Sequence, residues 1–150
     1  IELREMYPRG SEIREALKTW HYMLGLTVFF LVWLRITARL LGKTPPIVPE
    51  APRWQLMIAN TVELALYALM IVLPLLGWVM LSAKGEVIPF FGLHLPAVVD
   101  ANKVLAERTE EVHETLATVG YFLIGLHAIA ALFHHYVRRD NALRRMTLSR

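Results

Sequence analysis

The fold is decided by residues 115–137, which read TLATVGYFLIGLHAIAALFHHYV. This stretch contains no Asp, Glu, Lys or Arg. A bilayer core about 30 Å thick is crossed by roughly 20 mostly apolar residues of α-helix. The stretch therefore predicts a membrane-spanning helix. His127 lies in its interior, and an ionisable residue inside a span is costly enough to indicate a functional role.

Two further stretches of suitable length lie upstream, at about residues 20–41 and 54–83. The first contains Arg35 and Arg39 near its end, and the second contains one charged residue, Glu63. Long apolar stretches that alternate with charged connectors are typical of membrane spans joined by loops. The sequence therefore predicts three spans.

The composition agrees with a membrane protein. Hydrophobic residues make up 55% of the chain and charged residues 19%, whereas soluble domains average about 25% charged. The absence of Cys excludes disulfides, iron–sulfur clusters and covalently attached haem. We predict an all-α membrane protein, a single transmembrane helix bundle over residues 1–150. Because the chain begins at Ile1 rather than Met, we expect that an N-terminal piece precedes it.

The connectors differ in charge. Lys and Arg dominate residues 42–53 and the tail after residue 137, whereas acids match or outnumber them in residues 1–18 and 82–114. The positive-inside rule makes the basic face cytoplasmic, and with it the C-terminus. The basic tail then serves topology and contact with lipid headgroups, and it does not indicate a nucleic-acid site.

Other features near the span ends fit this arrangement. Trp20, Trp54 and Trp78 lie where an interfacial aromatic belt is expected. The connector GKTPPIVPEAPR is rich in proline and predicts a short, stiff turn. Residues 97–111 have the pattern of an amphipathic helix, which we expect to lie at the membrane interface.

Histidines recur at matched positions along the spans. His113 and His127 are fourteen residues apart, so their side chains lie on nearly one helix face, about 21 Å apart. Gly120 lies midway on that face, where a small residue lets a planar macrocycle or a neighbouring helix approach closely. Gly25 lies one turn after His21 and would again make room. Since His21 and His113 lie on the same side of the membrane, we predict that they form the axial pair of a haem b iron.

The same reasoning assigns His127 to a second haem, whose other axial ligand is missing. His134 and His135 are too close on the same helix to reach around the macrocycle. A preceding helix, Glu63 or water remain as alternatives, and we favour the helix. Apart from binding the iron, Glu63 has two interpretations: a proton-relay or cofactor-adjacent role, or only a hydrogen bond across the bundle. His94 is predicted to be a solvent-facing loop residue.

Arg35 lies fourteen residues after His21 and therefore at the depth of His127. Arginine binds carboxylates in a bidentate manner, so Arg35 is a candidate partner for the propionates of the inner haem. His135 and its neighbour His134 lie at the cytoplasmic end of the last span. For them, a role in a quinone pocket or beside a propionate is weighed against simple interfacial anchoring.

These residues lie in segments that together resemble a known family. The similarity to the bacterial cytochrome b561 family covers nearly the whole chain, and its branch that oxidises superoxide and reduces ubiquinone is particularly similar. The segments that carry the resemblance are WHYMLG at 20–25, TPPIVP at 44–49, LYALMIVLPLLGWVM at 66–80 and GYFLIGLHAIAALFHHYVRRDNALRRM at 120–146.

The resemblance implies a four-helix bundle with two b-type haems in a bacterial inner membrane. It implies that His21 and His113 ligate the periplasmic-side haem, and that His127 ligates the cytoplasmic-side haem opposite a histidine on a first helix. Relatives often carry a histidine at the position of Glu63, so this chain departs from the family pattern there.

A haem with two histidine ligands transfers electrons singly. We therefore expect an oxidoreductase that passes electrons from a periplasmic donor, superoxide, to ubiquinone. Lys84 and Lys103 are candidates for attracting the anion. One alternative is a haem b membrane-anchor subunit that relays electrons from a dehydrogenase or hydrogenase to quinone. Another is a structural membrane subunit with incidental histidines.

Overall fold

The computed structural model describes residues 6–8, 10–42 and 52–141. The proline-rich connector and most of the basic tail lie outside these residues. The described elements are three long helices, a short hairpin and a π-helical end: α2 (Glu12–Leu41), α3 (Arg53–Lys84), β1 (Ile88–Phe90), β2 (Leu93–Leu95), α4 (Lys103–Phe133) and η1 (His134–Arg138).

All three predicted spans are confirmed as helices long and apolar enough to cross a membrane. Helix α3 matches its predicted span to within a residue at each end, and Pro74 lies inside it. Helix α2 begins at Glu12, well before the predicted start of the span at residue 20, because Ser11 caps it, accepting a hydrogen bond from the Arg14 backbone N–H at 3.3 Å.

The amphipathic helix expected at residues 97–111 is confirmed only in part, because residues 97–102 are not helical and residues 103–111 belong to a longer helix. Helix α4 starts at Lys103, where the side chain of Asn102 caps it by accepting from the Leu105 backbone N–H at 3.0 Å. It then runs unbroken to Phe133. The amphipathic turns are the first part of the third span itself, because no helix-breaking residue separates them from the apolar stretch.

The hairpin was not predicted from the sequence. Ile88 pairs with Leu95 and Phe90 with Leu93 in an antiparallel register. Phe91 and Gly92 form the two-residue turn, with φ values of 47° and 85°, as a type I′ turn requires. His94 is exposed as expected, but it lies in β2 rather than in a loop.

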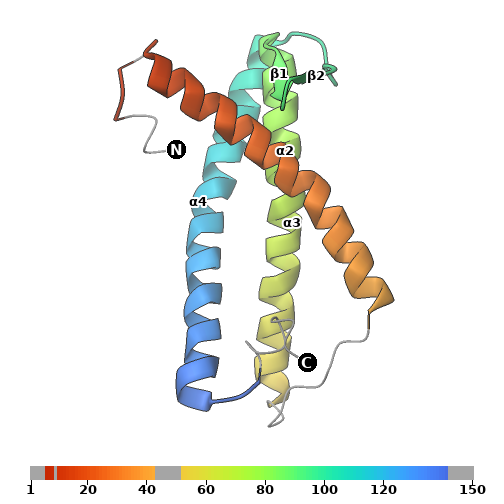
Figure 1. Cartoon of the computed structure of the whole chain (residues 1–150), viewed down its shortest axis with the longest axis vertical. Helices are drawn as coiled ribbons and strands as arrows, with labels where there is room; N and C mark the ends of the chain where they lie inside the picture. The colour runs from red at the N-terminus through yellow and green to blue at the C-terminus, as the bar shows by residue number, and fades with distance from the viewer. Residues whose placement is uncertain (1–5, 9, 43–51, 142–150) are drawn as a thin grey trace.

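Helix α3 is the spine of the molecule, because it packs against both α2 and α4. Helix α2 crosses α3 obliquely and diverges from α4 (Figure 1), and in the described parts no Cα of α2 comes within 8 Å of one in α4. A small core of Leu26, Leu81 and Ile88 joins α2, α3 and the hairpin at one end. Most other large apolar side chains face outward, as lipid contact requires.

Candidate functional site

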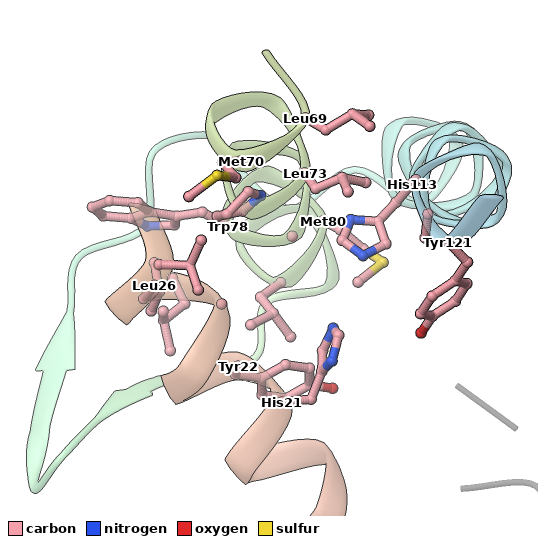
Figure 2. Close-up of a pocket in the computed structure, with 18 of the residues that line it drawn as sticks. His21, Tyr22, Leu26, Leu69, Met70, Leu73, Trp78, Met80, His113 and Tyr121 are labelled. Atoms are coloured by element: carbon pink, nitrogen blue, oxygen red, sulfur yellow. The ribbon is translucent and has the colours of Figure 1, made fainter. Parts of the chain in front are cut away.

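A largely apolar pocket of about 260 Å³ lies between α2, α3 and α4, close to the hairpin. All three helices contribute to it, and Figure 2 shows their side chains converging on the space between them. Ile88 of the hairpin closes one side. The polar groups among its apolar walls include the imidazoles of His21 and His113. Such a cavity, with a few convergent polar groups, is typical of a cofactor site.

The structure brings His21 and His113 together in this pocket, from helices whose backbones do not touch. Their ring centroids lie 6.1 Å apart with an interplanar angle of 74°, and the two rings point toward one another in Figure 2. Two imidazoles on one metal ion, with metal–nitrogen bonds of about 2 Å, have ring centres about 6 Å apart. The interplanar angle of 74° is compatible with two imidazoles on one metal ion, because each ring can turn about its bond to the metal.

The surroundings of His113 also fit a bound group. Its Nδ1 atom is buried and makes no hydrogen bond of good geometry among the described residues, although the ring also interacts with the Leu73 backbone. Burying a polar atom without a partner costs free energy, and a metal ion or hydrogen-bonding ligand would remove that cost. Gly77 of α3 lies beside the ring, since a Cβ there would meet His113 Cε1 at 3.7 Å. The pocket residues therefore fit a haem b held by two imidazoles.

Both glycines singled out in the sequence line the pocket. Gly25 faces open space, with no atom within 4 Å of an added Cβ, whereas Gly120 is buried against Leu69 at 3.5 Å. Sequence reasoning missed Gly77. Its role depends on how α3 and α4 are aligned, and only its place inside the second span hinted at it.

The other candidate histidines lie away from this pocket. His127 is half-buried on α4, and it makes no hydrogen bond or ion pair with the described residues. The His135 ring packs against Tyr136, with centroids 4.8 Å apart. His134 Nδ1 lies 2.5 Å from the Asp140 carboxylate in the π-helical end. None of the three lines the pocket with His21 and His113.

Polar contacts join α2 to α3 farther along the bundle. Arg35 Nε donates to the Tyr67 hydroxyl at 3.0 Å. Arg39 forms an ion pair with Glu63, so Glu63 does bond across the bundle, as one of its two interpretations held. The structure does not place Arg35 against His127, since α2 and α4 diverge toward this end (Figure 1).

The lysines proposed to attract an anionic donor are both paired with acids. Lys84 Nζ lies 2.9 Å from Glu110, and Lys103 Nζ lies 3.8 Å from Glu107. Neither lysine supplies the uncompensated positive charge that the sequence argument assumed. The structure therefore gives no electrostatic support to superoxide through these two residues.

Comparison with known proteins gives consistent similarities over almost all of the chain. The sequence profile of the family described as "Prokaryotic cytochrome b561" matches residues 2–148. The chain is 38% identical over 146 residues to "Cytochrome b561 homolog 1" of Escherichia coli (strain K12), covering 97% of this chain and 83% of that protein. It is 40% identical over 146 residues to "Probable superoxide oxidase CybB" of Yersinia pestis, covering 97% and 82%. "Cytochrome b561 homolog 2" of Escherichia coli is 27% identical over 127 residues, covering 84% and 68%.

Proposed function

The chain belongs to the prokaryotic cytochrome b561 family, and from that premise we propose that His21 and His113 are the axial ligands of its haem b. Family membership makes the protein a multi-pass bacterial membrane protein that binds haem b and transfers electrons. What we propose is which residues bind the haem, how many haems are bound, and which molecules donate and accept the electrons.

The observation that carries the assignment is the opposition of two imidazoles 6.1 Å apart in an otherwise apolar pocket. His21 and His113 would hold the iron, and Gly25 leaves room for the macrocycle. Gly120 lets Leu69 of α3 approach closely. The walls are largely apolar, and Ile88 on one side is buried. When bound between two imidazoles, haem b exchanges one electron at a time and keeps no position open for oxygen.

We place a second haem at His127, and the alignment of the helices supports this. Contacts between α3 and α4 show which of their residues lie at the same height. Gly77 of α3 faces His113 of α4, and Leu69 of α3 faces Gly120, seven residues further along α4. A further seven residues bring His127 to about the level of Glu63 on α3. Its second axial ligand would come from outside the described residues.

The α2–α3 contacts place the inner arginines at a similar level. Arg39 is bonded to Glu63 and Arg35 to Tyr67, one turn away. Arg35 is therefore within one helical turn of the height of His127 but lies to the side of it. We expect that position of a residue that binds the haem propionates rather than the iron. His135 lies about two turns beyond His127, at the proposed rim of this second site.

For the overall reaction we propose electron transfer from a donor outside the cytoplasm to ubiquinone in the inner membrane, with the C-terminus in the cytoplasm. Superoxide is the donor we favour, because a relative 40% identical to this chain is named a probable superoxide oxidase. The chain's part is to position two haems across the bilayer and to hold their surroundings dry.

Rapid mixing tests this proposal. Purified protein in lipid, reconstituted with haem, is mixed with superoxide in the presence and absence of ubiquinone, and haem absorbance is followed. We expect fast haem reduction, followed by reoxidation only when the quinone is present. If superoxide produces no reduction, that donor is wrong. Stable co-purification with a larger redox enzyme would favour the membrane-anchor alternative.

A further inference from the structure

Two polar contacts between α2 and α3 form adjacent rungs of a ladder. Arg35 and Arg39 are four residues apart on α2, and their partners Tyr67 and Glu63 are four residues apart on α3. Because the helices run antiparallel, each rung lies one turn from the other. Both rungs fall within stretches predicted to span the membrane, where polar side chains are rarely kept without a role.

The rungs differ in charge. Arg39 is compensated, because Glu63 is a carboxylate. Arg35 has a neutral partner, the Tyr67 hydroxyl, and its guanidinium carbon lies 5.9 Å from the centre of the Tyr67 ring. No carboxylate of the described residues contacts Arg35. The ladder as a whole therefore carries one net positive charge, and that charge sits on Arg35.

The contact with Tyr67 also fixes which part of Arg35 remains available. Tyr67 takes the Nε–H, so the two terminal nitrogens of the guanidinium are left to bind another group. A guanidinium presented in this way suits the two oxygens of a carboxylate or a phosphate. An uncompensated cation within a span is costly, so an anion bound there is favoured strongly.

We propose that Glu63 and Tyr67 give the two arginines different roles, a difference that we call the sorting of the arginines. Glu63 neutralises Arg39, and Tyr67 holds Arg35 as the one net cation, which binds a haem propionate. The proposal rests on the second haem proposed at His127. Tyr67 is then a positioning residue that acts through Arg35, and Glu63 sets the local charge. A phosphate of a lipid headgroup has matching chemistry, and the test below separates it from the propionate.

Redox titration of the protein in lipid nanodiscs, followed by haem absorbance, tests the sorting. Reduction adds negative charge to a haem, so nearby positive charge raises its midpoint potential. Arg35→Gln should lower the midpoint of one haem, and Tyr67→Phe should lower the same midpoint by less. Glu63→Gln should raise it, because Arg39 is then released as a second net cation.

A charge-balanced double variant separates charge from structure. Glu63→Gln combined with Arg39→Gln removes one positive and one negative charge, and we expect the midpoint to return close to that of the unaltered protein. Thr61→Val is the matched control on α3, because the Thr61 hydroxyl bonds only the Met57 carbonyl of its own helix among the described residues. It should leave both midpoints unchanged.

Several results would overturn the sorting. If Arg35→Gln retains both haems with unshifted midpoints, Arg35 does not bind a propionate, and the proposal fails. If Glu63→Gln and the double variant shift the midpoint equally, the effect is structural and the charge argument fails. A protein that binds haem only at His21 and His113 would overturn the second haem and this proposal together, while leaving the first site intact. The Tyr67→Phe variant retains the ring, so it remains informative should a charge variant fail to fold.

Discussion

His21 and His113 project from two helices whose backbones stay apart, so the imidazoles meet only through their side chains. An arrangement of this kind depends on both residues, since no third histidine of the described residues lines the pocket. The nearest other histidine on α4 is His127, about 21 Å further along.

Removing either histidine should therefore remove the same haem. We expect His113→Ala to lower the ratio of haem to protein by about half if two haems are bound, because one imidazole alone holds the iron poorly. His21→Ala should have the same effect, and the double variant should cause no further loss. The measurement is the haem content by pyridine haemochrome absorbance against protein concentration. An unchanged ratio, or additive losses, would show that the two residues do not share an iron.

Two glycines offer a matched comparison of space inside and outside the pocket. An added Cβ meets no atom within 4 Å at either Gly25 or Gly125, but only Gly25 lines the pocket. Gly25→Leu should fill the volume intended for the macrocycle and lower the haem content, whereas Gly125→Leu should leave it unchanged. Absorbance spectra of the two purified variants make the comparison. Equal haem content in both would remove the argument for close approach at Gly25.

The succession of the spans was enough to predict that His21 and His113 would lie at the same depth, because the start of the first span and the start of the third span fall on the same side of the membrane. The sequence could not predict the contact between Gly77 and His113, because this contact depends on how α3 is aligned along α4. The ion pair of Glu63 with Arg39 was equally hidden. Partners on different helices are set by packing, which no single helix encodes.

At the scale of elements, the hairpin is attached to the bundle by several kinds of contact. The Trp78 indole N–H donates to the Pro96 carbonyl at 3.0 Å, and the Val98 backbone N–H donates to the Ser82 hydroxyl at 3.1 Å. Phe90 packs against Phe30 of α2 with centroids 5.6 Å apart. The hairpin is therefore a fixed wall of the pocket rather than a loose connector.

Ile88 should be the most sensitive residue of that wall, because it is 2% exposed and lines the pocket. Ile88→Ala is expected to cost about 2–5 kcal/mol, from lost burial and the cavity left behind. Leu93→Ala is the control in the same hairpin, because Leu93 is 65% exposed. Thermal melting followed by haem absorbance should show a clearly lower midpoint for the first variant only. Equal midpoints would mean that the hairpin does not support the site.

The sequence predicted the spans well and the connector poorly, for physical reasons. A span is marked by a long absence of charge, which is a strong signal over about 20 residues. The strands Ile88–Phe90 and Leu93–Leu95 are too short to show a period, and Gly92 was the one sign of their turn. At residues 97–111, the amphipathic pattern was read correctly as helix but assigned to the wrong element.

At the scale of the whole molecule, the orientation in the membrane follows from where charge collects. The C-terminal ends of α2 and α4 and the N-terminal end of α3 lie at one end of the bundle (Figure 1). Described arginines gather there, at Arg39, Arg53, Arg138 and Arg139. The haem assigned to His21 and His113 lies toward the other end, beside the hairpin. The positive-inside rule then directs that haem toward the outer face.

Single cysteines can test this orientation cleanly, because the chain contains no Cys of its own. Val98→Cys and Leu41→Cys replace uncharged residues that are 51% and 83% exposed at opposite ends, so the Lys/Arg bias that sets topology is left intact. In intact spheroplasts, a membrane-impermeant maleimide should label the cysteine at position 98 and leave the one at position 41 unlabelled until the cells are lysed. The reverse pattern would place the His21–His113 site on the cytoplasmic side. An electron donor outside the cytoplasm could then no longer reach that haem first, and the proposed direction of electron flow would have to be abandoned.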